Sequence, residues 1–440
     1  MPGPVRLPES ATHAGVAWCG VATMLLGVSV LNFWSPWSDI AYIALAVMAC
    51  TALGIFVPDL LWQHIYRRAL VAPSVVAPQA GSRWPRVFTK FIGLLGSVGF
   101  IALLYWMFPE YRAAPSFYLH YWTALRVLLP AWGLLALPYL YWVDGRLAAP
   151  EDALWQYGRA LLLRWTGLSG GVIGQHLLGW LVKGFFLPLM FTYFCDNLHQ
   201  LLHYDLKRIH GFGGVYDWAY FTLYFIDVSL VSMTYLISLK LTDTHIRSTE
   251  PSALGWTVAL VCYQPLWSLI GSQYLAYDAG RAWGSWLQGT AWAYDVWGSL
   301  ILLLVVVYVW ATIAFGGRFS NLTHRGIITN GPYRYTKHPA YFAKNLSWWM
   351  ISMPFMLSTG IAESLRHCLL LLVLNGIYYL RAKTEERHLS LDPVYCEYAL
   401  WIERHGLLRW LGRLPCIGAL ARWRLRFSDP QTQWGQPPRA

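Results

Sequence analysis

Apolar segments close to the length of a lipid bilayer recur along almost the whole chain. A helix needs about 20 mostly apolar residues to cross the hydrocarbon core. Candidate segments lie near 15–34, 38–57, 88–108, 117–142, 172–194, 215–239, 253–271, 296–315, 345–360 and 366–380. The sequence therefore predicts an all-α, polytopic integral membrane protein with about ten transmembrane helices. The last two segments are short and are compatible with one re-entrant helical pair.

The composition agrees with this fold class. Hydrophobic residues make up 56% of the chain and charged residues 12%, whereas soluble domains carry about 25% charged residues. The net charge of +11 would suggest a nucleic-acid partner in a soluble protein. Here the basic residues flank apolar segments, so membrane topology explains them and no nucleic acid is expected. The seven cysteines are scattered and form no Cys-x-x-Cys pair, which is typical of buried apolar thiols.

The distribution of Lys and Arg predicts how the chain is oriented. If the N-terminus is cytoplasmic, the basic residues of 318–344 and of the tail after Leu380 lie on the cytoplasmic side. The outer loops then carry only Arg112, Lys207, Arg208, Arg281 and Arg366. This bias obeys the positive-inside rule. It predicts that both termini are cytoplasmic and that the polar residues 323–344 share a face with the C-terminal tail.

The first candidate site segment is GPYRYTKHPAY, residues 331–341. Asn330-Gly331-Pro332 is a turn signal, because Gly tolerates positive φ and Pro fixes φ. His338 precedes Pro339 and is therefore disfavoured in the α region. We expect irregular backbone here, followed by a helix from about Ala340 whose N-terminus suits a carboxylate.

The second candidate segment is YYLRAKTEERHLSLDPVYCEY, residues 378–398. It predicts an apolar helix that becomes charged where it leaves the membrane. Arg381, Glu385 and His388 recur at helical spacing, and Glu386 lies beside them. Adjacent carboxylates at a membrane exit are costly unless they are paired or solvated, so they are candidates to accept hydrogen bonds from an ammonium group and ribose hydroxyls.

The two segments together offer donors for a carboxylate and acceptors for an amine and a ribose. Tyr333, Tyr335 and Tyr341 add aromatic faces that suit an adenine or a sulfonium. This combination fits S-adenosylmethionine as the cofactor.

These segments resemble the isoprenylcysteine carboxyl methyltransferase and phospholipid methyltransferase superfamily. The resemblance covers about residues 294–413. It rests on Gly331, Pro332, Tyr333, His338, Pro339, Tyr341, Glu385, Glu386, Tyr395 and Tyr398. It implies membrane helices whose cytoplasmic loops wrap the methyl donor, while a lipid-like acceptor enters from the bilayer. Three positions depart from the family pattern: Lys337 replaces an Arg, Ala343 replaces a Gly, and Leu391-Asp392-Pro393 replaces a Phe-Gly.

The predicted site combines the residues with the resemblance. The residues assigned to the methyl donor are Gly331, Pro332, Tyr333, Arg334, Lys337, His338, Pro339, Tyr341, Glu385 and Glu386. The catalytic candidates are Glu386, His338 and Arg404, and the acceptor-binding candidates are Tyr395 and Tyr398. Glu386 or His338 would serve as the base for an amine or thiol acceptor, and Arg334, Lys337 or Arg404 would orient an anionic one. No metal is assigned.

The predicted function is transfer of a methyl group to a lipid-like or small hydrophobic acceptor: a prenylcysteine carboxylate, a phospholipid amine or a thiol. Membrane sterol reductases carry a similar His-Pro-x-Tyr segment and use NADPH, so they are the alternative. A transporter or membrane sensor is a further alternative. The predicted units are a multi-span region at 1–290 of unassigned role, a catalytic domain at 291–426 and a disordered tail at 427–440. The oligomeric state remains open.

Two other groups of residues have side chains that could carry chemistry. Cys195, His199 and His203 recur at four-residue intervals and could hold a metal, but an interfacial helix with amphipathic histidines explains them better. Arg126, Lys183 and Asp227 fall inside predicted spans, where they are expected to pair with one another or to line a cavity.

Overall fold

The computed structural model describes residues 6–35, 37–63, 82–112, 117–147, 149–278, 282–356, 360–407 and 409. Eight of the described helices are long and apolar enough to cross a membrane. They are α1 (Ala14–Trp34), α2 (Ile40–Leu61), α4 (Trp84–Met107), α5 (Leu119–Asp144), α7 (Gly170–Leu202), α8 (Gly211–Leu236), α12 (Ala291–Ala314) and α14 (Ile361–Leu389). In lipid the backbone must satisfy its own hydrogen bonds, so apolar segments of this length become continuous helices. The all-α, multi-pass membrane fold is confirmed.

The expected count of about ten continuous spans is not confirmed. The segment expected at 253–271 is broken into α9 (Ala253–Leu260) and α10 (Leu266–Gln273), with Pro265 directly before α10 where it cannot continue a helix ladder. The segment expected at 345–360 is α13 (Pro339–Ser352), 14 residues long. At 1.5 Å per residue, such a helix extends only about 21 Å, less than the roughly 30 Å hydrocarbon core.

These interrupted segments still run alongside the long helices. The pair α9–α10 follows α14: the guanidinium Nη2 of Arg387 lies 3.1 Å from Oε1 of Glu250 at one end, and Nδ1 of His367 lies 3.0 Å from the Tyr277 carbonyl at the other. Helix α13 lies against α12, where the indole of Trp297 donates to the Met350 carbonyl at 2.9 Å.

The smaller elements lie at the ends of the long helices. They are α6 (Ala153–Leu161), α11 (Trp283–Leu287), α15 (Pro393–His405), the 3₁₀ turns η1 (Pro109–Tyr111), η2 (Leu206–Arg208), η3 (Gly316–Arg318) and η4 (Gly331–Arg334), and the strands β1 (Ser248–Thr249) and β2 (Thr323–His324). The two strands pair antiparallel, with Ser248 opposite His324 and Thr249 opposite Thr323. This short ribbon joins two loops that are far apart in the sequence.

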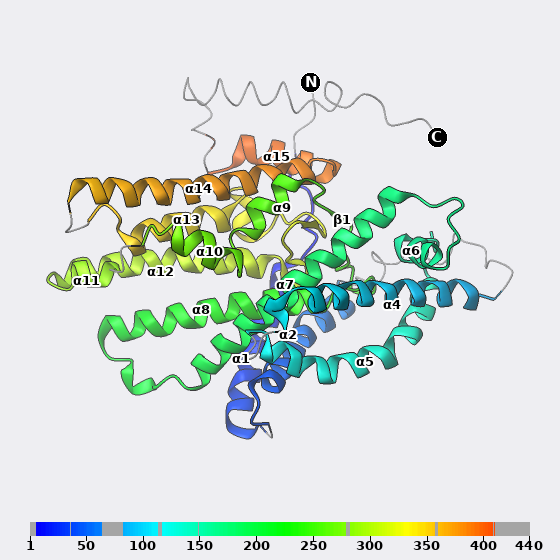
Figure 1. Cartoon of the computed structure of the whole chain (residues 1–440). Helices are drawn as coiled ribbons and strands as arrows, with labels where there is room; N and C mark the ends of the chain where they lie inside the picture. Colours follow the sequence, from blue (N-terminus) through cyan, green and yellow to red (C-terminus); the bar gives the residue numbers. More distant parts are fainter. Residues whose placement is uncertain are drawn as a thin grey trace.

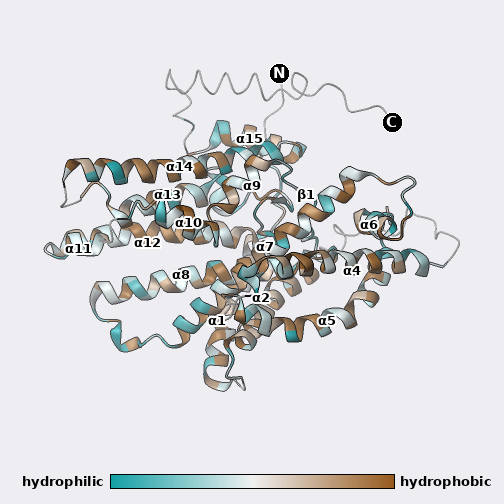
Figure 2. Cartoon of the chain, in the orientation of Figure 1, coloured by the Kyte–Doolittle hydropathy of each residue, from teal (hydrophilic) through white to brown (hydrophobic). Residues whose placement is uncertain are grey.

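The helices form two groups on either side of α7. Helices α14, α13, α12 and α8 are stacked in that order on one side, and α4, α5 and α6 lie on the other (Figure 1). Apolar residues predominate along α4, α5 and α12, whereas polar residues are frequent on α15 (Figure 2). The bulk of the molecule is therefore suited to lipid, and the charged helix α15 caps one end of the stack.

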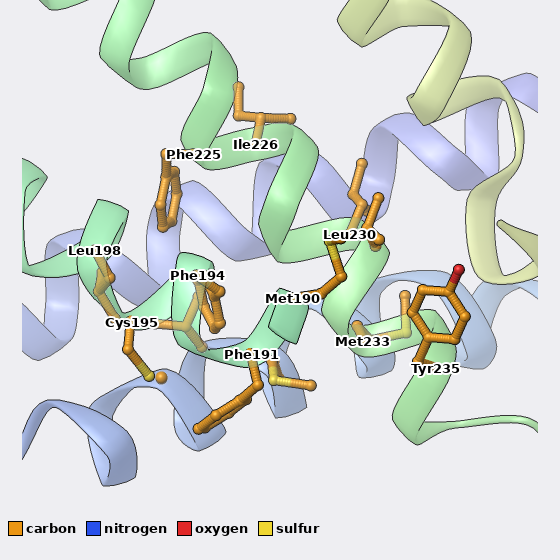
Figure 3. Close-up of a cluster of buried hydrophobic side chains, with 14 of the residues drawn as sticks. Met190, Phe191, Phe194, Cys195, Leu198, Phe225, Ile226, Leu230, Met233 and Tyr235 are labelled. Atoms are coloured by element: carbon orange, nitrogen blue, oxygen red, sulfur yellow. The ribbon is translucent and has the colours of Figure 1, made fainter. Parts of the chain in front are cut away.

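The centre of the core lies between α7 and α8. Phe194 of α7 lies close to Phe225 of α8, while Phe191 and Cys195 of α7 belong to the same core but point away from Phe225 (Figure 3). All are nearly fully buried. Closely packed interiors of this kind resist deformation. Helix α8 leads directly into the loop that carries β1.

A buried ion-pair network fixes the end of α8 to the N-terminal helices. Nζ of Lys90 lies 2.8 Å from Oδ1 of Asp144, and Nζ of Lys240, just beyond α8, lies 2.6 Å from Oδ2 of Asp152. Nζ of Lys90 also lies 3.6 Å from Oδ1 of Asp152. Buried charges need such partners, because an unpaired one is costly. The network therefore determines where the loop after α8 begins.

The three charged residues expected inside spans do not pair with one another; all three lie in the described part of the chain. Asp227 accepts hydrogen bonds from Tyr308 at 2.6 Å and Thr312 at 2.5 Å. The ammonium of Lys183 lies over the Trp180 ring, 5.4 Å from its centroid, and Arg126 is exposed.

Candidate functional site

Two buried arginines shape the loop between α12 and α13. Arg325 donates to the carbonyls of Thr234, Thr244 and Phe319 at 2.6 to 3.1 Å. Its guanidinium therefore satisfies carbonyls at and beyond the end of α8, where the helix ladder no longer does. Arg318 donates to the Arg325 carbonyl at 2.7 Å. Irregular backbone is possible in this buried loop because the two arginines donate the hydrogen bonds that water would otherwise supply to the carbonyls.

The same network joins the loop after α8. Oδ2 of Asp243 lies 2.8 Å from Nη2 of Arg318 and 3.3 Å from Nη2 of Arg247. Burial opposes ionisation of Asp243, but its pKa is lowered because the ion pairs to Arg318 and Arg247 outweigh the loss of solvation. Together with the β1–β2 ribbon, this holds residues 237–250 against residues 316–330.

The N-terminal segment before α1 is hydrogen-bonded to the end of α12 and to the loop after it. The Ala11 amide donates to the Ile327 carbonyl at 2.9 Å. Thr12 donates to the Ala314 carbonyl at 2.7 Å and accepts from Asn330 at 3.1 Å. Thr329 donates to the Pro8 carbonyl at 2.9 Å. The first described residues therefore lie beside the loop of the candidate site, although their compartment stays a prediction.

The first sequence segment adopts the turn and helix start that its residues predict. Gly331 has φ +56° and begins η4; a Cβ there would lie 3.2 Å from Cβ of Ala314, so Gly allows both the backbone shape and the close approach. Pro339 is the first residue of α13, where its missing N–H is harmless. His338 is the cap residue, and its side chain is free to face the cavity.

Two lysines and a histidine surround Glu386 near the C-terminal end of α14. Oε1 of Glu386 lies 3.1 Å from Nε2 of His338 and 3.5 Å from Nζ of Lys337, and Oε2 contacts Nζ of Lys383. His338 and Lys337 come from the first segment and Glu386 from the second. The two segments thus meet in space, as their shared face predicts.

Glu385 lies on the other side of His338. Tyr341 donates to Oε1 of Glu385, and Nδ1 of His338 lies 3.9 Å from Oε2. The His338 and Tyr341 rings are stacked with centroids 5.6 Å apart and an interplanar angle of 4°. Stacking and hydrogen bonding together hold His338 between two carboxylates.

These residues lie at a cavity whose wall includes several tyrosines as well as charged side chains. Tyr263, Tyr308, Tyr341 and Tyr378 line it. The Arg381 guanidinium lies over three of these rings, 4.9 to 5.6 Å from their centroids, and donates to Asn321 at 3.2 Å. Such contacts keep a cation inside an apolar wall. The cavity therefore combines apolar surface with a few fixed polar groups, as ligand sites usually do.

Helix α15 closes the cavity from outside the membrane helices. Tyr398 donates to the Tyr333 carbonyl at 2.7 Å, which ties α15 to η4. The Tyr395 hydroxyl is buried and has no hydrogen-bond partner among the described residues. Burial raises the pKa of Tyr333, Tyr395 and Tyr398, so these phenols remain neutral. An unsatisfied buried hydroxyl at a cavity is a candidate ligand contact.

Most of the sequence-predicted residues are brought together. Those that line the cavity are Tyr333, Lys337, His338, Tyr341, Glu385, Tyr395 and Tyr398. Glu386 contacts His338, while Gly331, Pro332 and Pro339 shape the backbone. Arg334 and Arg404 are exposed and do not line this cavity. The roles assigned to all of these residues stay predictions.

Sequence reasoning missed several residues of the cavity wall. Arg318, Asn321 and Arg325 lie in the polar run RFSNLTHR just before the first segment, and that run was the available signal. Glu250 also lines the cavity, from a loop 81 residues earlier than Gly331 in the numbering. No local pattern marks it, because its place depends on the β1–β2 pairing.

Cys195, His199 and His203 are not gathered around a common point. Cys195 is buried among apolar side chains (Figure 3). His199 and His203 are exposed and stacked, with ring centroids 4.2 Å apart. The described residues contain no group of three or more His, Cys, Asp or Glu side chains that could hold a metal.

Among known protein families, the model of the isoprenylcysteine carboxyl methyltransferase (ICMT) family matches residues 296–391. The C-terminal third carries an ICMT-family segment. The match begins in α12, contains both the loop with His338 and the pair Glu385-Glu386, and ends before Tyr395, Tyr398 and Arg404. It confirms the resemblance and supports a membrane methyltransferase.

Neither the curated proteins nor the solved structures gave a match to this chain. The ICMT match therefore bears on the C-terminal third, and the role of residues 1–290 is argued from structure. Chemically, the site offers carboxylates, a histidine and aromatic faces around one cavity.

Proposed function

We propose that this protein is an integral membrane methyltransferase that transfers a methyl group from S-adenosylmethionine to a lipid-like or small hydrophobic acceptor. The observation that carries the proposal is the meeting of His338, Tyr341 and Glu385 at one cavity, with Glu386 in contact with His338; all four residues lie in the ICMT-matched segment. The chemistry of these groups matches an amino acid joined to a nucleoside through a sulfonium. The cavity lies among helices suited to lipid, which favours a hydrophobic acceptor.

The cavity residues fit such a cofactor. Glu385 and Glu386 provide carboxylates for an ammonium and for ribose hydroxyls. The α13 N-terminus after Pro339 offers backbone N–H groups for the carboxylate, next to His338. Tyr341 and Tyr378 provide aromatic faces, and the Tyr395 hydroxyl lacks a partner among the described residues. When bound, S-adenosylmethionine supplies an electrophilic methyl group.

The chain's own residues then have three tasks. Tyr341 and the two carboxylates hold the reacting groups in line, because displacement at a methyl carbon needs alignment rather than a covalent enzyme intermediate. The aromatic wall excludes water from the cavity. His338 or Glu386 takes the proton when the acceptor nucleophile carries one. S-adenosylmethionine would supply the methyl group and keep the sulfur as the leaving group, so the residues would need no other reactant.

The acceptor class is part of the proposal. Lys337 lines the cavity, whereas Arg334 and Arg404 are exposed, so we favour Lys337 to orient an anionic acceptor. Tyr395 and Tyr398 would contact the acceptor where α15 covers the cavity. A prenylcysteine carboxylate, a phospholipid amine and a thiol are the candidate acceptors.

The test is calorimetric titration of the folded, detergent-solubilised protein with S-adenosylmethionine and, separately, with NADPH. Binding of S-adenosylmethionine alone is expected, and a screen of lipid extracts with radiolabelled methyl donor then identifies the acceptor. Binding of NADPH alone would reject the methyltransferase and favour a membrane reductase. Binding of neither compound would favour a transporter or sensor.

A further inference from the structure

Glu250 is a buried carboxylate in the cavity wall that lies outside the ICMT-matched residues. It follows β1, and its amide donates to the Leu322 carbonyl at 2.8 Å, which extends the pairing with the segment before β2. Only 2% of the residue is exposed. A segment of the N-terminal two thirds thus places an acidic side chain at the cavity.

One carboxylate oxygen of Glu250 is fully used by the protein. Oε1 accepts from the Ser252 amide at 2.9 Å and from Arg387 at 3.1 Å, and it contacts the Ser252 hydroxyl. Ser252 in turn caps α9 through the Gly255 amide. A Cβ at Gly255 would lie 2.5 Å from Cγ of Glu250, so the glycine leaves room for this side chain. The orientation of the carboxylate is therefore fixed.

The second oxygen, Oε2, is buried and has no hydrogen-bond partner among the described residues. None of the described polar side chains donates to it. Nε2 of His388 lies 2.9 Å from the Ser248 hydroxyl instead, while Nε2 of His324 and the hydroxyls of Thr249 and Thr323 are themselves buried without a hydrogen-bond partner among the described residues. Leaving a charged acceptor unsatisfied in a buried place is costly. A donor that enters the cavity would remove that cost.

The acidic groups of the cavity lie on two sides of α14. Glu385 and Glu386 contact Tyr341 and His338 of the α13 side, whereas Glu250 contacts Arg387 from the α9 side. A ligand with hydrogen-bond donors at two separate places matches this arrangement. S-adenosylmethionine has an ammonium in its amino-acid half and N–H and O–H donors in its nucleoside half.

We propose that Oε2 of Glu250 accepts a hydrogen bond from an N–H or O–H group of the nucleoside half of the methyl donor. This assignment rests on the proposed function and extends the cofactor site beyond the ICMT-matched residues. The donor is either the adenine amino group or a ribose hydroxyl. Glu250 would then give the N-terminal two thirds of the chain a direct part in binding.

The test compares E250Q with R387Q in the full-length, detergent-solubilised protein. Both variants alter the Glu250–Arg387 pair, but Arg387 does not line the cavity. With S-adenosylhomocysteine as the calorimetric probe, E250Q should weaken affinity roughly tenfold, the size expected for one charge-assisted hydrogen bond. R387Q should bind like the unsubstituted protein. Equal losses in the two variants would mean that Glu250 only anchors α9 to α14 and would overturn the assignment.

Ligand analogues identify the donor and separate the outcomes. The E250Q loss should vanish for the S-adenosylhomocysteine analogue that lacks the partner group, either the adenine amino group or one ribose hydroxyl. A loss of the same size with every analogue would also overturn the assignment. If E250Q does not fold, E250D replaces it, since the shorter carboxylate should lose the same contact. Unchanged binding by a folded Glu250 variant rejects this assignment alone, whereas no binding by the unsubstituted protein rejects the proposed function as well.

Discussion

At the scale of single residues, the His338–Glu386 contact links the two sequence segments. Each segment was recognisable by its residue types, because turn residues, a His-Pro pair and adjacent carboxylates are unusual beside apolar spans. That the two segments lie on the same side of the membrane, and can therefore meet, could be predicted from the distribution of Lys and Arg. The 3.1 Å contact itself could not, because it depends on how α13 and α14 pack.

We expect H338A and E386Q each to reduce affinity for S-adenosylmethionine at least tenfold. Each change removes a charge-assisted contact at the cavity, which contributes about 1.5–3 kcal/mol. Calorimetric titration of detergent-solubilised protein measures the loss. The matched control is E363Q, which removes a half-exposed carboxylate from the far end of the same helix. Unchanged affinity in either cavity variant would exclude that residue from the donor site.

Acid should destabilise the fold through His324. Burial lowers its pKa to about 4, although Asp392 favours the charged form, while Arg247, Arg318 and His388 disfavour it. Because an unfolded histidine has a pKa near 6.5, the unfolded chain binds more protons between these values. The resulting loss of stability begins as the pH falls below about 6.5 and reaches about 2 kcal/mol at pH 5.

The measurement is the thermal unfolding midpoint at pH 7 and pH 5 for the unsubstituted protein and H324Q. The variant should lose less stability on acidification. A remaining slope is expected, since burial also lowers the pKa of His245 to about 4. Identical pH dependence in the two proteins would show that His324 is not held neutral by the fold.

At the scale of elements, apolar length predicted seven of the eight long helices well, whereas α14 extends over 29 residues where a short segment at 366–380 was expected. It did not predict that α9 and α10 are separate or that α13 ends after 14 residues. The break before α10 coincides with Pro265, which hydropathy alone does not weigh. The loop of Arg318 and Arg325 was also missed, since its hydrogen bonds reach carbonyls more than 80 residues earlier in the chain.

We expect D243N to destabilise the loop after α8. Asn tolerates the left-handed backbone at this position, where φ is +50°, so the change mainly removes charge. Arg318 would then remain buried without its carboxylate, which costs roughly 3–5 kcal/mol. Denaturant or thermal unfolding in detergent measures this loss.

The matched control is R247Q, which removes the more exposed partner of Asp243. Its effect should stay below about 1 kcal/mol, as for surface ion pairs. Similar losses in D243N and R247Q would contradict the view that the buried Arg318 pair dominates.

At the scale of the whole molecule, the N-terminal segment and the loop after α8 are both hydrogen-bonded to the region between α12 and α13, which lines the cavity. Hydrogen bonds from both of these segments therefore connect residues before the predicted boundary at 290 with residues after it. Sequence patterns do not reveal contacts of this kind, because Thr12 and Ala314 are 302 residues apart. The predicted tail at 427–440 lies outside the described residues.

We expect T12V to weaken both stability and donor binding. It removes the bond to Ala314 and the one from Asn330, worth about 1–2 kcal/mol together. Unfolding midpoints and calorimetry on the full chain measure the two effects. The matched control is T222V, whose exposed hydroxyl bonds only its own helix. If T12V and T222V have the same unfolding midpoint and the same affinity for the methyl donor, the N-terminal segment does not support the site.

The hydrogen bonds of residues 8–12 also have a consequence for biosynthesis. Residues 8–12 leave the ribosome first, but their partners at 314–330 are made some 300 residues later. The early segment must remain undocked until α12 and the loop after it have been inserted. A chain that ends before the loop after α12 lacks most of the residues that line the cavity. Completion of the cavity would therefore report that the chain has been translated and assembled through Tyr398, the last described residue that lines it.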